Sequence, residues 1–191
     1  VNGPVMIVFA DTIIEADLTL LQAKPHEALA WVKRVEDPRR FGVVELGEDG
    51  YVSRLIEKPT SMDNNLAVVG FYYIQDGLGL MDAIEEQLAS DIQTKGEYYL
   101  ADALQIMLGR GLKMRVEEVD VWEDCGNPES VLHTNNYLLE HGHDNSADVN
   151  ADGFLIVPPV NIHPSAQINN SVVGPGATIA ADCQINCSII R

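Results

Sequence analysis

The chain has 191 residues, of which 46% are hydrophobic, so it can bury a core in one large domain or two modest ones. Its 12 basic and 29 acidic residues give a formal net charge of −17, which repels nucleic acid and leaves no basic stripe to follow a phosphate backbone. We therefore expect no nucleic-acid partner. An anionic substrate would need lysines, backbone N–H groups or a divalent cation to offset this charge.

Membrane insertion is also not expected. No segment approaches the roughly 20 consecutive apolar residues of a membrane-spanning helix, and the chain does not open on a basic segment followed by an apolar one. We expect a cytoplasmic protein with no membrane partner. The three cysteines, Cys125, Cys183 and Cys187, form no C-x-x-C pair, so we expect reduced packing residues rather than a disulfide framework or a zinc site.

The first part of the chain alternates strand-like and helix-like segments, which predicts an α/β layered domain. Runs rich in Val, Ile and Tyr predict strands over residues 5–9, 30–35, 42–46, 52–57, 67–74 and 113–121. Apolar residues at helical spacing predict helices over residues 78–88, 99–108 and 128–139. Asn127 before Pro128 is typical of a helix start, and Glu48-Asp49-Gly50 indicates a hairpin turn.

The composition changes after residue 141. Residues 142–153 are mostly polar and are expected to form a linker. Beyond it, Ile168-Asn-Asn-Ser-Val172-Val173 recurs 17 residues later as Ile185-Asn-Cys-Ser-Ile189-Ile190. Isoleucines also recur at steps of about six residues, at Ile162, Ile168, Ile179 and Ile185. This pattern predicts short parallel strands stacked in a β-solenoid, in which each rung buries its aliphatic residue against the next.

Four short segments carry the functional signal. They are Phe9-Ala10-Asp11-Thr12; Phe41-Gly42-Val43-Val44 with Ile56-Glu57-Lys58-Pro59; Gly96-Glu97-Tyr98-Tyr99-Leu100-Ala101-Asp102-Ala103; and Trp122-Glu123-Asp124-Cys125-Gly126. In their order and spacing they resemble the sugar-1-phosphate nucleotidylyltransferases, the NDP-sugar pyrophosphorylases that include glucose-1-phosphate thymidylyltransferase. The resemblance runs from about Pro4 to Leu139.

This resemblance implies an incomplete Rossmann-like nucleotide-diphospho-sugar transferase domain over residues 1–141, of the α/β class. The linker of residues 142–153 would join it to a short left-handed β-helix of hexapeptide repeats over residues 154–191. The Gly-rich loop that holds the nucleoside triphosphate in this family does not occur in the sequence. We therefore expect this chain alone to bind sugar phosphate poorly and to turn over little or nothing. The exposed end of a short solenoid leads us to expect a homo-oligomer.

Two aspartates are candidates for a metal site. Asp11 follows the strand of residues 5–9, at the carboxyl end where open α/β sheets bind ligands, although an aspartate there is also a common turn or cap residue. The resemblance implies that Asp11 and Asp124 bind one Mg²⁺ ion, whose other positions go to phosphate oxygens and water. Glu123 is expected to be a solvated residue on the opposite face of its strand, because neighbours alternate sides.

The candidate sugar-phosphate residues surround a strand end. Glu57 and Lys58 precede Pro59, and in a regular strand they would face opposite ways, so the chain must turn one of them. The resemblance implies that Lys58 neutralises the sugar phosphate, while Glu57, Gly42 and Glu97 hold the sugar. Gly42 on its own also fits a simple bend.

Gly70 interrupts a strongly strand-forming run, as expected where a ligand crosses the strand or a bulge forms. In the first case Tyr72 would line the sugar site. Asp102 is expected to support Glu97 rather than to contact the sugar directly. His141 and His143 lie in the polar segment without a third ligand, so we expect them to be solvated and not to bind metal.

The reaction that the resemblance implies is attack by a sugar-1-phosphate oxygen on the α-phosphorus of a nucleoside triphosphate, with release of pyrophosphate. Alignment and charge neutralisation would supply most of the catalysis. The sequence leaves the sugar open among glucose-1-phosphate, N-acetylglucosamine-1-phosphate and mannose-1-phosphate, and the resemblance favours glucose-1-phosphate with dTTP or UTP, for nucleotide-sugar biosynthesis. Two alternatives remain: a non-catalytic regulatory or assembly subunit of the same fold, and a hexapeptide-repeat acyltransferase, for which His163 fits a rung position but is commonly structural.

Overall fold

The computed structural model describes residues 2–23 and 26–191. The chain divides into two compact units, Val1–Trp122 (unit 1) and Glu123–Arg191 (unit 2), and each is described by itself. Among the described residues, no helix combines the length and apolar character needed to cross a membrane.

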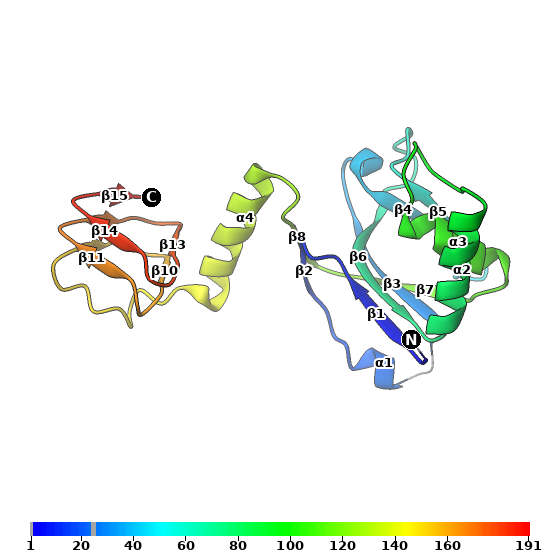
Figure 1. The fold of residues 1–191 in the computed structure, drawn as a ribbon, viewed down its shortest axis with the longest axis horizontal. Coiled ribbons are helices and arrows are strands. Elements are labelled where there is room, and N and C mark those ends of the chain that lie inside the picture. Colours follow the sequence, from blue (N-terminus) through cyan, green and yellow to red (C-terminus); the bar gives the residue numbers. More distant parts are fainter. Residues whose placement is uncertain (1, 24–25) are drawn as a thin grey trace. The chain divides into compact units, whose positions relative to one another are not determined.

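Unit 1 is built on a mixed six-stranded sheet in the order β5-β4-β6-β3-β7, with β1 also paired to β6 (Figure 1). Its strands are β1 (Val5–Val8), β3 (Ala28–Arg34), β4 (Gly42–Leu46), β5 (Val52–Glu57), β6 (Leu66–Ile74) and β7 (Met114–Glu118). β3 and β7 run parallel, whereas β1, β3 and β4 each run antiparallel to β6, and β4 runs antiparallel to β5. The predicted α/β class is confirmed as a mixed α/β fold with a central sheet.

β6 changes partner at Gly70. On one edge, β6 pairs first with β4, where Ala67 lies opposite Val43, and then with β1, where Phe71 lies opposite Val8. Between these pairings Gly70 adopts a φ of +77°, a conformation that glycine reaches without a steric cost. The bend allows one strand edge to serve two partners in succession.

Apolar residues alternate along β3 and fill both faces of the sheet. Ala28, Ala30 and Val32 belong to the cluster beneath α2 (Gly77–Ala89) and α3 (Leu100–Gly109), which lie on the same face of the sheet (Figure 1). Leu29 and Trp31 belong to the cluster on the other face. The helix side chains that are buried in the first cluster are Leu80, Ala83, Ala101, Ala103, Leu104 and Met107.

Shorter elements complete unit 1. They are α1 (Leu20–Ala23), the 3₁₀ helix η1 (Pro38–Arg40), and β2 (Thr12–Glu15), which pairs with β8 (Val121–Asp124), the strand in which unit 1 ends. The predicted hairpin turn is confirmed between β4 and β5, where Gly50 adopts a φ of +76°.

The predicted strand over residues 113–121 is wrong in its extent, because it forms two strands, β7 and β8. The chain leaves β3 at this point. Val119 N–H still donates to Val32 O at 2.9 Å, but the next carbonyl, of Asp120, accepts from the side chain of Lys33 at 2.7 Å.

Unit 2 begins with the end of β8 and with α4 (Pro128–Leu138), followed by the short helical segment η2 (Leu139–His143). The predicted Asn127 cap is confirmed as a capping box: Ser130 N–H donates to Asn127 Oδ1 at 2.9 Å, and Asn127 N–H donates to Ser130 Oγ at 3.3 Å. Pro128 occupies the first turn, where no N–H is needed.

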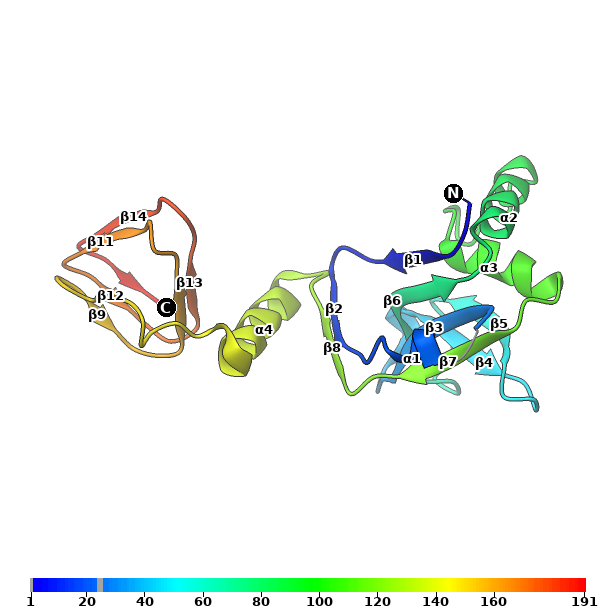
Figure 2. The same ribbon diagram turned by 90° about the horizontal axis from the view of Figure 1, so that it is seen from below.

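The rest of unit 2 is a series of short parallel strands. They are β9 (Leu155–Ile156), β10 (Val160–Ile162), β11 (Gln167–Asn169), β12 (Val172–Val173), β13 (Ala177–Ile179), β14 (Gln184–Asn186) and β15 (Ile189–Ile190). Partners lie 17 residues apart and form three groups, β9-β12-β15, β10-β13 and β11-β14 (Figure 2). The predicted recurrence is therefore confirmed as strand register, with Ile168 opposite Ile185 and Val172 opposite Ile189.

The polar segment before these strands is tied to β10. Asn145 N–H donates to Val160 O at 3.0 Å, and the Asn145 side chain both donates to Ile162 O and accepts from Ile162 N–H at 2.9 Å. Asp144 accepts from Val160 N–H at 3.1 Å. These contacts satisfy backbone groups of β10 on the edge that β13 does not use.

Candidate functional site

The centre of the candidate site is the end of β5. Glu57 is the last residue of this strand and lies opposite Gly42 of β4. Lys58 follows with a φ of +45°, which breaks the alternation that would otherwise direct the two side chains to opposite faces. The turn that the sequence required between these residues is thus made by the backbone of Lys58 itself, whose N–H donates to Phe41 O at 3.0 Å.

Gly42 makes room for the carboxylate of Glu57. A Cβ atom at position 42 would lie 3.0 Å from Glu57 Oε2 and 3.1 Å from Val68 Cγ2, closer than most side-chain contacts. Half-burial raises the pKa of Glu57, and the carboxylates of Asp102 and Glu97 add to this, while Lys58 and Lys95 oppose it. A half-buried carboxylate at a strand end is suited to accept hydrogen bonds from a polar ligand.

The ammonium of Lys58 points to a second segment. Lys58 Nζ donates to the hydroxyl of Tyr99 at 2.9 Å and lies 4.9 Å from the centre of its ring, and the Tyr99 hydroxyl donates to Glu97 Oε2. The hydrogen bond to Tyr99 is the main cause that raises the pKa of Lys58. The structure therefore brings Lys58 and Glu97 together, as the sequence predicted, but through Tyr99, which the sequence analysis did not assign. Glu57 precedes Lys58 in the chain and acts on it through its charge.

Asp102 supports this segment, in agreement with its predicted role. Its Oδ1 accepts from Thr94 Oγ1 at 3.0 Å, which ties the turn before Glu97 to the first turn of α3. Its buried Oδ2 has no hydrogen-bond partner in the described part of the chain.

The space beside Gly70 is filled by the protein itself. A Cβ atom at position 70 would lie 2.6 Å from the ring of Phe9, so the close approach that this glycine allows is made by an aromatic side chain. Tyr72, whose ring centre is 6.2 Å from that of Phe9, is only 2% exposed and belongs to the core beneath the helices. Burial, with a smaller contribution from Glu57, raises its pKa. Gly70 and Tyr72 are thus both buried.

Known proteins with related sequences identify the family. Residues 2–141 match the family model described as Nucleotidyl transferase. The chain belongs to this family. The family resemblance noted in the sequence is therefore confirmed.

Two relatives and one solved structure illustrate the match of this nucleotidyl transferase chain. It is 30% identical to glucose-1-phosphate thymidylyltransferase of Streptomyces griseus, over 96% of the chain and 55% of that protein. It is 31% identical to bifunctional protein GlmU of Methanococcus vannielii, over 74% of the chain and 34% of that protein. A crystal structure from Bacillus anthracis, of a protein assigned as a glucose-1-phosphate thymidylyltransferase, has a TM-score of 0.58 at 22% identity, over 78% of this chain and 56% of that one, which shows likeness of fold. The chain spans about half the length of the Streptomyces griseus relative and about a third of the archaeal one.

The two aspartates of the predicted metal site belong to different units. Asp11 is exposed in the turn between β1 and β2, in unit 1, and Asp124 is half-buried at the end of β8, in unit 2. Asp124 Oδ1 accepts from Gly126 N–H at 3.1 Å, which leaves Oδ2 for another ligand. Both residues offer the carboxylate oxygens that Mg²⁺ prefers, so their donor type fits this ion. Over residues 2–23 and 26–191, no cluster of three potential metal-binding side chains is present, and the pairing of Asp11 with Asp124 stays a prediction.

The expectation for Glu123 is wrong. This residue is 8% exposed, and its Oε2 lies 2.7 Å from His133 Nδ1 and 3.4 Å from Thr134 Oγ1. Alternation does separate Glu123 from Asp124, but α4 covers the face that Glu123 occupies. A buried carboxylate with these partners is part of the packing between β8 and α4.

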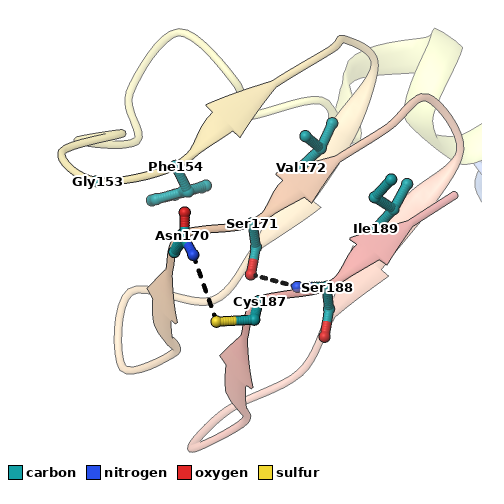
Figure 3. A pocket seen from close by; sticks show the side chains of 8 residues that line it. All are labelled: Gly153, Phe154, Asn170, Ser171, Val172, Cys187, Ser188 and Ile189. Atoms are coloured by element: carbon teal, nitrogen blue, oxygen red, sulfur yellow. Dashed lines mark hydrogen bonds between the residues drawn. The ribbon is translucent and has the colours of Figure 1, made fainter.

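Unit 2 also contains a polar groove and histidines that have local partners. A groove of about 460 Å³ is lined only by uncharged residues, among which Asn170 donates to Cys187 Sγ at 3.3 Å and Ser188 N–H donates to Ser171 Oγ at 3.1 Å (Figure 3). His163 accepts from Ser165 N–H at 3.1 Å, and His141 Nδ1 lies 2.7 Å from Tyr137 O. These histidines have local structural partners.

Proposed function

We propose that this chain is part of a sugar-1-phosphate nucleotidylyltransferase that transfers a nucleoside monophosphate from dTTP or UTP to glucose-1-phosphate. In this reaction a phosphate oxygen of the sugar phosphate forms a bond to the α-phosphorus. The bond from that phosphorus to the oxygen bridging to the β-phosphate breaks, and pyrophosphate leaves. The product would serve nucleotide-sugar biosynthesis.

The observation that carries the proposal is the arrangement at the end of β5. Lys58 presents an ammonium beside the half-buried carboxylate of Glu57, and Glu97 lies one tyrosine hydroxyl away. An ammonium can neutralise the phosphate, while carboxylates accept hydrogen bonds from sugar hydroxyls. Gly42 would contribute by leaving room for the carboxylate of Glu57 rather than by holding the sugar itself.

Asp11 and Asp124 would hold Mg²⁺, which when bound supplies positive charge against the phosphate oxygens. The name of the Streptomyces griseus relative, glucose-1-phosphate thymidylyltransferase, supports the choice of glucose-1-phosphate and of a thymidine nucleotide. Because the chain spans only part of these relatives, the activity is a proposal for the protein to which it belongs.

The proposal extends to the organisation of the chain. The 17-residue register of unit 2 supports a left-handed β-helix of hexapeptide repeats over residues 154–191. Residues 1–141 would form the nucleotidylyltransferase domain, and residues 142–153 would link it to the β-helix. Exposed strand ends in such a stack favour a homo-oligomer, which analytical ultracentrifugation tests.

Sugar-phosphate binding tests the site directly. Calorimetric titration of the chain with glucose-1-phosphate should give weak binding that Lys58→Met reduces at least about tenfold, because a charge-assisted hydrogen bond to phosphate is lost. Lys33→Met is the control, since it removes the same ammonium from another lysine of unit 1, one that donates to the backbone carbonyl of Asp120. Equal affinities in the Lys58→Met and Lys33→Met variants would contradict the proposed role of Lys58.

A further inference from the structure

Lys58 is held at three points. Its N–H donates to Phe41 O at 3.0 Å, its carbonyl accepts from Lys95 Nζ at 2.9 Å, and its ammonium donates to the Tyr99 hydroxyl at 2.9 Å. Lys58 adopts a φ of +45°, a backbone conformation that residues other than glycine rarely adopt. Such a conformation persists where its surroundings fix it. Two of the three contacts come from the segment that links α2 to α3.

Lys95 lies in a hydrogen-bonded turn. Thr94 and Glu97 exchange backbone hydrogen bonds of 3.0 and 3.1 Å, and the two residues between them have φ values of +54° for Lys95 and +82° for Gly96. Positive φ at both central positions is characteristic of a type I′ hairpin turn. The bond from Thr94 Oγ1 to Asp102 ties this turn to α3. The backbone of Lys95 is therefore held by hydrogen bonds on both sides while its side chain donates to the carbonyl of Lys58.

Tyr99 is anchored in the same way. Its carbonyl accepts from the side chain of Gln87, which is buried in α2, at 3.0 Å, and from Asp102 N–H at 3.1 Å. The backbone of Tyr99 is thus held by hydrogen bonds to residues of α2 and α3, while its phenol hydroxyl contacts the ammonium of Lys58. A neutral hydroxyl orients the ammonium without cancelling its charge. Since an ammonium has three N–H donors, two remain for a ligand.

We propose that Lys95 and Tyr99 are positioning residues for Lys58: Lys95 holds its turned backbone, and Tyr99 holds its ammonium ready for the phosphate of the sugar-1-phosphate. The inference rests on the proposed function for the identity of the ligand. The arrangement of the three residues themselves is independent of that ligand.

The test uses two variants with matched controls. Tyr99→Phe removes only the hydroxyl, and Tyr98→Phe removes the same group from a neighbouring side chain that bonds to Asp91 instead. Lys95→Met removes the ammonium, with Lys33→Met as its control, and Lys95→Arg keeps a donor. Thermal unfolding of every variant checks that unit 1 is folded.

The first readout needs no ligand. NMR of the chain with ¹³C-labelled lysine ε-carbons gives the pKa of Lys58, which the Tyr99 hydroxyl raises more than any other group. Two carboxylates also act on Lys58. They belong to Glu57 and Glu97, and all variants keep them. We expect the pKa of Lys58 to fall in Tyr99→Phe and to stay unchanged in Tyr98→Phe.

The second readout is the Kd of glucose-1-phosphate. We expect Tyr99→Phe and Lys95→Met each to raise it about 5- to 20-fold, and Lys95→Arg to restore most of the affinity. If the parent chain binds no glucose-1-phosphate while the pKa of Lys58 still falls in Tyr99→Phe, the proposed function fails and the positioning role stands. If Tyr99→Phe matches Tyr98→Phe in the pKa of Lys58, or binding persists unchanged in both Tyr99→Phe and Lys95→Met, the positioning role is overturned.

Discussion

Replacing Gly70 by alanine should destabilise unit 1 by about 2 to 3 kcal/mol, from two separate costs. The first is backbone strain, because a residue with a Cβ atom at a φ near +77° loses about 1 kcal/mol. The second is a clash, since the new Cβ would lie 2.6 Å from Phe9 Cδ2 and 2.7 Å from its Cγ. The ring must then swing away. Because Phe9 is already 43% exposed, the lost packing is partial, about 1 to 2 kcal/mol.

Gly50→Ala isolates the first cost. Gly50 has nearly the same φ, +76°, and no atom lies within 4 Å of a Cβ atom added there. Urea unfolding followed by tryptophan fluorescence reports on unit 1 alone, because the chain's two tryptophans, Trp31 and Trp122, both belong to it. We expect Gly70→Ala to lose more stability than Gly50→Ala by about 1 to 2 kcal/mol. Equal losses would refute the reasoning that Phe9 fills the space beside Gly70.

Three further predictions concern the packing, the cap and the buried carboxylate. Leu104→Ala, at a fully buried position, should cost unit 1 about 2 to 5 kcal/mol in urea unfolding, whereas Leu88→Ala, at a position 52% exposed, should cost far less. Asn127→Ala should lower the stability of α4 by about 1 kcal/mol, visible by circular dichroism as earlier loss of helix, and Asn127→Asp should retain most of it. Because burial raises the pKa of Glu57 in the folded chain above its ordinary value of 4.5, the stability linked to its protonated form is present below that ordinary value and is lost as pH rises through the folded pKa. Urea unfolding of Glu57→Gln should therefore show a gain over the parent chain that grows from pH 4 to pH 7, and a constant difference would contradict the burial effect.

Local patterns in the sequence were enough to predict most elements of the fold. The strand over residues 30–35 and the Asn127 cap depend on neighbouring residues, and both are found, the strand as part of β3. The 17-residue recurrence became strand register because each rung repeats the chemistry of the one before. The split between β7 and β8 was not predicted. It lies where the Lys33 side chain donates a hydrogen bond to Asp120 O, a contact over 87 residues that no local pattern reveals.

The candidate site was predictable only in its residue types. Glu57, Lys58 and Glu97 were assigned from motifs, but Tyr99, which joins Lys58 to Glu97, is 41 residues from Lys58, and its contact follows from tertiary packing. The doublet Tyr98-Tyr99 offered a weak signal, because only one of the two tyrosines can face Lys58 and the sequence does not say which. The prediction for Glu123 was wrong for the same reason, since strand alternation does not reveal that α4, through His133, covers the face of β8 on which Glu123 lies.

Magnesium-dependent release of pyrophosphate from dTTP or UTP in the presence of glucose-1-phosphate tests the central claim most directly. We would measure it with the chain extended at its N-terminus by the Gly-rich loop segment of the family, beside Asp124→Asn and Lys58→Met and with Lys33→Met as the control. The account predicts release by the extended chain and by Lys33→Met that is lost in the other two variants. Release that persists in Asp124→Asn and Lys58→Met, or no release with any common sugar phosphate, would contradict it.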